Sequence, residues 1–160
     1  MEKISDLKGF KTTLIKLQKR GKPIILTGGC FDILHIGHIR FLEEAKKSGG
    51  TLIVLLEPDE KVRKLKGAKR PVFSQHERAR TLSSLIPVDY IILLPYLSGS
   101  GYDQYISVIK PDIIATTEND PILEKKRKQA KKVSGKLSVV KYFTSLSSSQ
   151  IADKLKKESL

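Results

Sequence analysis

Short apolar runs separated by stretches of helical spacing organise this chain of 160 residues. The runs lack the strict alternation of a half-exposed strand, and each ends at glycine, proline or a polar cluster: residues 23–29, 51–58, 89–95, 112–117 and 136–143. Such runs are typical of strands that are buried on both faces of a parallel sheet. The pattern predicts an α/β fold, a Rossmann-like five-stranded parallel sheet with helices on both faces.

Helical spacing marks several of the connecting segments. Apolar residues recur at helical intervals in residues 4–20, so we expect a leading helix within residues 1–21. Residues 38–47 carry a second apolar face, which two glycines end. Ser74 and Glu77 have the spacing of a capping box at the start of a helix. Further helices are expected over residues 74–85, over the lysine-rich residues 124–132, and from the serines before residue 150 to near Leu160.

The order of these elements predicts where a ligand binds. In open parallel sheets, ligands bind beyond the carboxyl ends of the strands, at the point where the winding reverses. The turn after the first run and the loop before the last helix both follow a strand. We therefore expect these two loops at one edge of the sheet.

Length and composition indicate one globular domain, residues 1–160, with a hydrophobic share of 39% and a charged share of 29%. No apolar run approaches the roughly 20 residues of a membrane span, and the start of the chain lacks the features of a signal peptide. A single cysteine, Cys30, excludes an internal disulfide framework. These features predict a cytoplasmic protein that does not enter a membrane.

The formal net charge of +13 raises the question of a nucleic-acid partner. Lysine-rich residues 124–132 fit a solvated helix face equally well, and no aromatic residues alternate with the basic ones as a stacking platform requires. The charge also suits a small polyanion such as a nucleoside triphosphate. We therefore do not expect nucleic acid to be the partner.

The densest chemistry lies in the sequence GGCFDILHIGH, residues 28–38. His35 and His38 are three residues apart at the entry of a helix, and Gly37 permits close approach of a ligand. A helix N-terminus offers backbone N–H groups and the positive end of the helix dipole to a phosphate. The pattern favours phosphate chemistry in which the imidazoles donate hydrogen bonds to phosphoryl oxygens.

Three other interpretations of this segment compete with phosphate binding. The histidines could be polar residues of a helix face without a chemical role. A zinc site requires three or four ligands, and neither Cys30 nor Asp32 completes a known spacing. A cysteine nucleophile with a histidine base is also conceivable. We therefore predict no protein metal site.

These residues resemble the signature of the HIGH nucleotidyltransferase superfamily, which has the cytidylyltransferase-like α/β fold. Three further blocks resemble that superfamily in the same order: residues 57–94, 109–114 and 145–151. The closest resemblance is to the adenylyltransferase domain of ADP-heptose synthases, through GCFDILH, RFLEEAK and VRKLKG. Glycerol-3-phosphate cytidylyltransferases and archaeal FMN adenylyltransferases are also similar.

The resemblance implies transfer of a nucleoside monophosphate from ATP, or from CTP, to a phosphorylated small molecule, with release of pyrophosphate. The expected acceptor is a sugar phosphate such as heptose 1-phosphate. Alternatives are glycerol 3-phosphate or a related polyol phosphate, and FMN. The resemblance also implies Mg²⁺ bound with the triphosphate, held mostly by its oxygens, and a possible homodimer.

The resemblance further implies the roles of individual residues. His35 and His38 would stabilise the α-phosphate. Lys64 and Lys66, which are expected in a loop, would reach the triphosphate or the acceptor phosphate, and Lys66 and Arg78 would belong to the catalytic anion cluster. Asp32 would brace the turn. The serines would cap the last helix and bind the β- and γ-phosphates, although one serine is enough for a plain cap. The implied nucleotide-binding residues are Gly29, Cys30, Phe31, Asp32, Gly37, Lys64, Thr117, Glu118, Asn119, Ser147, Ser148 and Ser149.

The chain departs from the family pattern after the fourth run. Relatives carry a segment of the Lys-Gly-x-Asp-Tyr type, where this chain has ATTENDP, Ala115 to Pro121. Before the closing serines, Lys141 stands where relatives have arginine or glycine, and residues 96–104 replace an acidic stretch with an acceptor loop or a plain connection. The changed segment leaves open a second hypothesis, a catalytically inactive nucleotide-binding module.

Overall fold

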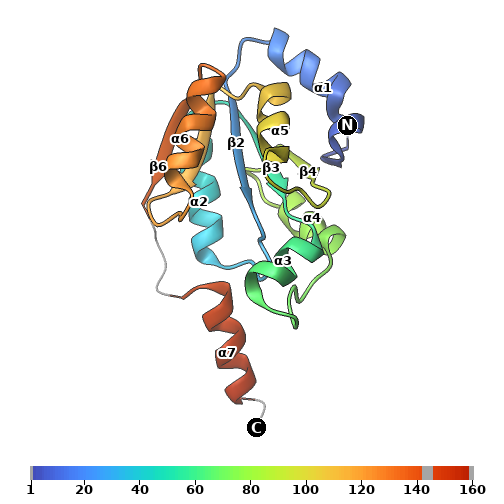
Figure 1. The fold of residues 1–160 in the computed structure, drawn as a ribbon, viewed down its shortest axis with the longest axis vertical. Helices are drawn as coiled ribbons and strands as arrows, with labels where there is room; N and C mark the ends of the chain where they lie inside the picture. Colours follow the sequence, from blue (N-terminus) through green and yellow to red (C-terminus); the bar gives the residue numbers. More distant parts are fainter. Residues whose placement is uncertain (1, 142–145, 159–160) are drawn as a thin grey trace.

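The computed structural model describes residues 2–141 and 146–158 and contains one parallel sheet of six strands in the order β1-β4-β3-β2-β5-β6 (Figure 1). The strands are β1 (Ile4–Ser5), β2 (Ile24–Gly29), β3 (Thr51–Leu56), β4 (Tyr90–Leu93), β5 (Ile113–Thr117) and β6 (Lys136–Val140). The helices are α1 (Leu7–Lys19), α2 (Ile36–Lys46), α3 (Asp59–Lys66), α4 (Gln75–Ser83), α5 (Gly101–Ile109), α6 (Leu123–Lys132) and α7 (Ser148–Glu158). The predicted α/β class is confirmed.

The predicted number of five strands is wrong, because a short edge strand precedes the first helix. Ile4 pairs with Ile91 of β4, and the Ile91 N–H donates to the Lys3 carbonyl at 2.7 Å. The helix begins only after Asp6, whose carboxylate accepts from the Gly9 N–H at 2.7 Å. The apolar spacing of this segment could not separate two strand residues from the helix that follows them.

Two segments that were expected to be loops are helical. Residues 59–66 form α3, with Asp59 and Glu60 in the first turn and basic residues in the last turn, an order that complements the helix dipole. Residues 101–109 form α5, whose first residues belong to the stretch 96–104 that was expected to be an acceptor loop or a plain connection. Lys64 and Lys66 therefore lie on a helix and not in a loop.

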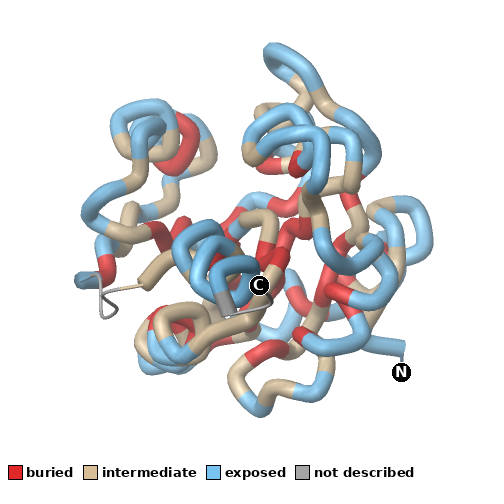
Figure 2. Tube along the Cα trace, turned by 90° about the horizontal axis from the view of Figure 1, so that it is seen from below, coloured by how far each residue is buried: buried red, intermediate tan, exposed pale blue. Residues whose placement is uncertain are grey.

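The sheet is covered on both faces, as predicted. Helices α2 and α4 pack on one face through residues such as Leu42 and Leu82, and α1, α5 and α6 pack on the other through residues such as Leu14 and Ile109. Neighbouring strand residues belong to opposite layers, as Ile25 and Leu26 do. Figure 2 shows that buried residues gather between exposed helical surfaces.

Strands β2 and β5 separate before they reach the carboxyl edge of the sheet. β2 pairs with β3 over its whole length, from Ile24 to Gly29, but it pairs with β5 only at Ile25 and Leu26. The chain continues from β2 to β3 on one side, whereas β5 lies on the other side, so the winding reverses here. The separation opens a crevice where open α/β sheets bind ligands.

The remaining elements largely follow the sequence pattern. The capping box of Ser74 and Glu77 is confirmed, since each side chain bonds the other residue's backbone. The strand predicted for residues 136–143 ends at Val140, and residues 142–143, like Leu160, lie outside the described part. Helix α7 extends away from the sheet beyond its carboxyl edge (Figure 1). None of the helices within residues 2–141 and 146–158 is long and apolar enough to span a bilayer.

Candidate active site

A cavity of about 430 Å³ occupies the crevice between β2 and β5. Three segments far apart in the sequence meet there: the turn after β2, the end of α3, and the start of α7. The predicted meeting of the first and last loops at one edge is therefore observed. The predicted residues that line the cavity are Gly29, Cys30, Phe31, His35, Gly37, His38, Lys66, Thr117, Asn119, Ser147 and Ser148.

The two histidines stand at the N-terminus of α2. The backbone of His35 is extended, and its Nδ1 accepts from the Gly37 N–H at 3.2 Å, so that His35 is the N-cap. Because Nδ1 is the acceptor, the neutral ring carries its proton on Nε2, which can donate to a ligand. The rings of His35 and His38 lie 3.9 Å apart between centroids, and Phe31 lies 5.1 Å from His38.

Both histidines are neutral at physiological pH in the unliganded protein. Burial lowers the pKa of His38 to about 3, and the nearby His35 and Lys66 add to this effect. Burial and Lys66 also lower the pKa of His35. Neutral imidazoles suit a site that must donate hydrogen bonds and that holds cations close by.

Lys66 connects the end of α3 with the start of α7. Its ammonium donates to the Ser148 Oγ at 2.7 Å, and burial lowers the pKa of the lysine. Ser147 caps α7, since its Oγ accepts from the Gln150 N–H at 3.3 Å and the Gln150 side chain accepts from the Ser147 N–H at 2.7 Å. Ser147 therefore both caps α7 and lines the cavity, and Ser148 lines the cavity beside it, whereas Ser149 is exposed and does not line the cavity.

Asp32 lies beneath the turn and does not line the cavity. Its carboxylate is fully buried, pairs with Arg70 and accepts from the Val72 N–H at 2.7 Å. This network holds the turn after β2 against the segment after α3, which fits the predicted bracing role. Gly29 allows the turn to close, because a Cβ there would stand 3.0 Å from the Phe31 ring.

Arg78 does not reach the anion cluster that was predicted for it. Its side chain is 1% exposed and donates to the carbonyls of Phe73, Cys30 and Glu57 and to the Asp59 carboxylate. Those groups belong to the turn after β2, the end of β3, the start of α3 and the start of α4. We infer that Arg78 is a positioning residue that holds these segments together.

Lys64 and Glu118 also lie outside the cavity lining. The Lys64 ammonium donates to the Tyr96 hydroxyl at 3.3 Å on the outer side of α3. Glu118 is exposed, and its N–H donates to the Val140 carbonyl at 3.2 Å. Burial raises the pKa of Cys30, which keeps its side chain a thiol and disfavours the nucleophile hypothesis.

On the side of β5, which we call the β5 lip, the cavity is lined by a hydrogen-bonded cluster of polar side chains that the sequence analysis missed. Lys126, from the lysine-rich helix α6, donates to the Asp120 carboxylate at 2.6 Å and to the Thr116 Oγ1 at 3.1 Å. Thr116 also donates to Asp120. Burial raises the pKa of Asp120, but the bonds from Lys126, Thr116 and the Ile122 N–H outweigh burial and lower it. Because α6 follows β5, its first turn lies beside the carboxyl edge, and only this topology distinguishes Lys126 from its exposed neighbours.

A polar group lies beside the turn on the side of β3. Glu57 follows β3, its N–H donates to the Gly29 carbonyl at 3.1 Å, and its carboxylate oxygens each accept from the Tyr102 hydroxyl at 3.0 Å. Burial raises the pKa of Glu57. The Lys61 ammonium lies 5.8 Å from the ring centre of Tyr96 and 5.7 Å from that of Tyr102.

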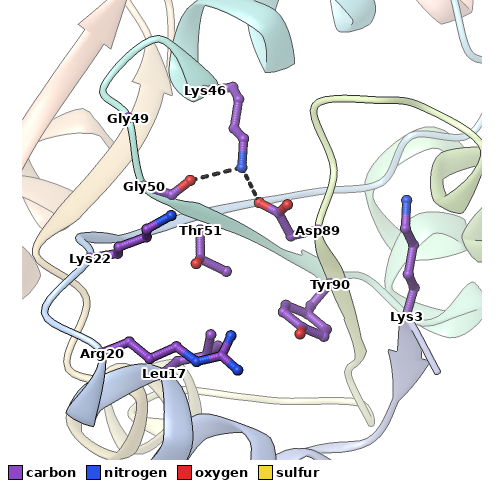
Figure 3. A pocket seen from close by; sticks show the side chains of 10 residues that line it. All are labelled: Lys3, Leu17, Arg20, Lys22, Lys46, Gly49, Gly50, Thr51, Asp89 and Tyr90. Carbon is purple, nitrogen blue, oxygen red and sulfur yellow. Dashed lines mark hydrogen bonds and ion pairs between the residues drawn. The ribbon is translucent and has the colours of Figure 1, made fainter. Parts of the chain in front are cut away.

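A second hollow, of about 790 Å³, lies at the opposite edge of the sheet, beyond the amino ends of the strands (Figure 3). Lys46 spans part of it and binds the Asp89 carboxylate and the Gly50 carbonyl. Arg20 and Lys22 also line this hollow. It contains none of the residues that the sequence analysis assigned to the site.

Comparisons with known proteins place these observations in a family context. Residues 26–153 match the family model described as cytidylyltransferase-like. The chain is 40% identical over 117 residues to bifunctional protein HldE of Desulfatibacillum aliphaticivorans, which covers 73% of this chain and 23% of that protein. It is 35% identical over 150 residues to bifunctional protein HldE of Campylobacter jejuni subsp. doylei, and the matched region covers 94% of this chain and 31% of that protein. The chain therefore spans less than a third of these relatives.

Solved structures agree with this match. The lipopolysaccharide core biosynthesis protein from Thermoplasma volcanium superposes with a TM-score of 0.62 at 30% identity, over 78% of this chain and 98% of that one. Pantoate-beta-alanine ligase from Francisella tularensis superposes with a TM-score of 0.64 at 16% identity, over 100% of this chain and 79% of that one. The second likeness concerns the fold alone.

Proposed function

Because this chain belongs to the cytidylyltransferase-like family of nucleotidyltransferases, we propose that it transfers the nucleoside monophosphate of ATP to a phosphorylated sugar and releases pyrophosphate. One observation carries the proposal. Two neutral histidines at a helix N-terminus, a half-buried lysine and a serine at a second helix N-terminus line one cavity at the point where the sheet reverses its winding. Each of these groups donates hydrogen bonds, as a triphosphate requires.

In this reaction a phosphate oxygen of the acceptor attacks the α-phosphorus of the triphosphate. A bond forms between that oxygen and the α-phosphorus while the bond to the bridging oxygen of the β-phosphate breaks, and pyrophosphate leaves with the bonding electrons. No protein nucleophile is needed, since catalysis comes from positioning and charge neutralisation. His35 Nε2–H and His38 would donate to the α-phosphate oxygens, and Lys66 and Ser148 would hold the leaving phosphates.

Mg²⁺ enters this proposal as part of the substrate, bound to the triphosphate oxygens. Among the described residues no three histidine, cysteine or acidic side chains are grouped to hold a metal ion. The two aspartates nearest the site are already paired, Asp32 with Arg70 and Asp120 with Lys126. The donor set of the chain therefore fits a magnesium–triphosphate complex better than a resident ion.

The proposed acceptor is a sugar phosphate, and three observations support it. The residues of the catalytic turn resemble ADP-heptose synthases, and the Thermoplasma volcanium neighbour is a lipopolysaccharide core biosynthesis protein. In addition, Glu57, Tyr102 and Lys61 lie on the β3 side of the turn. A carboxylate and aromatic rings there suit the hydroxyl groups and C–H faces of a sugar.

The test is pyrophosphate release with ATP or CTP and magnesium across a panel of acceptors. The panel contains heptose 1-phosphates, glycerol 3-phosphate, FMN and phosphopantetheine. The control is the His35→Ala/His38→Ala double variant, checked for folding by its thermal unfolding. We expect release with ATP and a sugar 1-phosphate, and its loss in the double variant.

Other results would revise the proposal in defined ways. Release with CTP and glycerol 3-phosphate, or with FMN, would keep the transferase and replace its substrates. Turnover of the double variant within a few-fold of the wild type would contradict the assigned chemistry. Tight ATP binding without release from any acceptor would favour the inactive nucleotide-binding module, the hypothesis that the changed residues 115–121 leave open.

A further inference from the structure

The floor of the cavity contains a buried hydroxyl that the protein does not satisfy. Thr27, on β2, is 2% exposed and lines the cavity. Its Oγ1 has no hydrogen-bond partner among the described residues. A buried hydroxyl without a partner is costly, so it is retained where something other than the folded chain completes it.

A second unsatisfied atom faces the same cavity. The Nδ1 of His38 is buried and also lacks a partner within the described part of the chain. Thr27 lies two residues after Ile25, which packs in the layer of α2, so its side chain lies on the α2 face of the sheet. Two unsatisfied polar atoms in one cavity indicate a polar ligand and not a packing defect.

Across the crevice, β5 presents a donor. The ammonium of Lys126 carries three protons, and its acceptors are Asp120 and Thr116. Lys126 lines the cavity, and its side chain is 18% exposed, so its charge is largely removed from solvent. The lips of the crevice therefore offer a hydroxyl on one side and a cation on the other.

The cavity has two chemically different ends. The histidines, Lys66 and Ser148 gather at the helix N-termini, where phosphates bind. Thr27 lies further back along β2, before the two glycines that open the turn. A nucleotide with its phosphates at the helix N-termini places its sugar and base between the two lips.

We propose that the Thr27 hydroxyl and the Lys126 ammonium bind the nucleoside part of the nucleotide, from opposite lips of the crevice between β2 and β5. The inference rests on the proposed function, which assigns a nucleoside triphosphate to this cavity. It makes Thr27 and Lys126 specificity-determining residues, although one had no assigned role and the other belongs to a helix that resembles a solvated surface.

The proposal predicts opposite effects of one substitution on stability and on binding. Thr27→Val keeps the shape of the side chain and removes the unsatisfied hydroxyl. The unliganded protein should unfold at an equal or higher temperature, because a buried polar group without a partner is lost. ATP affinity should fall about 3- to 10-fold, the effect of one hydrogen bond. A purely structural hydroxyl would lower the unfolding temperature and leave affinity unchanged.

The experiment measures dissociation constants for magnesium–ATP and for inorganic tripolyphosphate by calorimetry, and unfolding temperatures without ligand. The variants are Thr27→Val and Lys126→Met, with Thr27→Ser to retain the hydroxyl. The controls are Thr51→Val, a strand threonine at the opposite edge of the sheet, and Lys128→Met, an exposed lysine of α6. We expect Lys126→Met to weaken ATP about tenfold or more and Thr27→Val to leave tripolyphosphate affinity unchanged.

Each remaining outcome has a defined meaning. Equal loss of ATP and tripolyphosphate affinity in Thr27→Val would move the contact to the phosphates and overturn the inference. If Thr27→Val leaves ATP affinity unchanged or lowers the unfolding temperature, the role proposed for Thr27 is overturned. If Lys126→Met leaves ATP affinity unchanged, the role proposed for Lys126 is overturned. Failure of the wild type to bind both ATP and CTP would instead overturn the proposed function, and the inference with it.

Discussion

Basic residues line a hollow at each edge of the sheet, but the two hollows differ in whether their polar groups have partners in the protein. At the amino edge, the ammonium of Lys46 is satisfied by Asp89 and the Gly50 carbonyl, and that of Lys3 by the carbonyls of Ser83 and Val88. At the carboxyl edge, buried atoms of Thr27 and His38 have no partner among the described residues. The amino-edge hollow is the larger of the two, at about 790 Å³ against about 430 Å³.

Helix direction explains the difference. The amino ends of the strands meet helix C-termini, where basic residues such as Lys19 and Lys46 complement the negative end of the dipole. The carboxyl ends meet the N-termini of α2 and α7, which attract anions. Positive charge at the amino edge is therefore part of the fold, whereas positive charge at the carboxyl edge is available to a ligand. Neither the size of a hollow nor its positive charge therefore tells which of the two is the ligand-binding site.

The largest effect tests the support of the carboxyl edge. Arg78→Met should lower the free energy of unfolding by about 3–5 kcal/mol, because it leaves buried acceptors and the Asp59 carboxylate without their donor. Urea denaturation measures this loss. Arg80→Met, an exposed position of the same helix, should change stability by less than about 0.5 kcal/mol. Equal effects at both positions would mean that Arg78 does not hold the turn.

The next effect compares turnover at the two edges. His38→Asn should reduce kcat about 10²- to 10³-fold, as expected when a donor to a developing charge is lost. Lys22→Ala, at the amino edge, should stay within about twofold, since surface changes remote from a site are close to neutral. Steady-state pyrophosphate release measures both variants. A comparable loss of kcat in Lys22→Ala would contradict the assignment of catalysis to the carboxyl edge alone.

A matched pair of lysines separates binding from stability. Lys66→Met should weaken triphosphate binding about tenfold or more with little loss of stability, because the pKa of Lys66 is already lowered by burial of its charge. Lys46→Met should lower the free energy of unfolding by about 1 kcal/mol, since it breaks a partly exposed ion pair, and should leave triphosphate affinity unchanged. Calorimetry and urea denaturation of the two variants give the comparison. If Lys46→Met weakened triphosphate binding and Lys66→Met lowered only stability, the binding site would have to be assigned to the amino edge.

The last comparison concerns the pH dependence of stability. The pKa of His38 is about 3 in the folded protein against an ordinary value of 6.5, so the unfolded chain binds a proton that the folded chain refuses. Stability should therefore fall as the pH drops below 6.5, by about 1.4 kcal/mol from this group at pH 5.5. Unfolding of wild type and His38→Asn at pH 7.5 and 5.5 measures it. Equal slopes would show that His38 titrates normally.

The sequence pattern predicted what depends on local spacing. Buried strands, the capping box at Ser74, and two loops at one edge follow from periodicity and from the order of elements. Strand β1 was missed because two residues carry no period, and its pairing with β4 is a long-range contact. The helical state of residues 59–66 was missed because a short charged segment resembles a loop.

The candidate site divides in the same way. His35 and His38 were identified because they stand where a strand ends and a helix begins, whereas Lys66 and Ser148 were identified because the segments around them resemble the family. The burial of Arg78 and the inward position of Lys126 depend on packing between distant segments, and both side chains had the sequence environment of a surface helix. Thr27 was missed because a hydroxyl within an apolar run has no distinct pattern.

The early separation of β2 from β5 also divides the sheet into two groups of strands that share few paired residues. Strands β1 to β4 are joined by continuous pairing, and β5 pairs with β6 along its length, whereas the two groups share only Ile25 with Ile113 and Leu26 with Ile114. In native-state hydrogen exchange, the amides of β5 and β6 should therefore exchange through opening reactions of lower free energy than those of β2 and β3. A ligand that spans the seam would raise the protection of β5 and β6 toward that of the rest of the sheet.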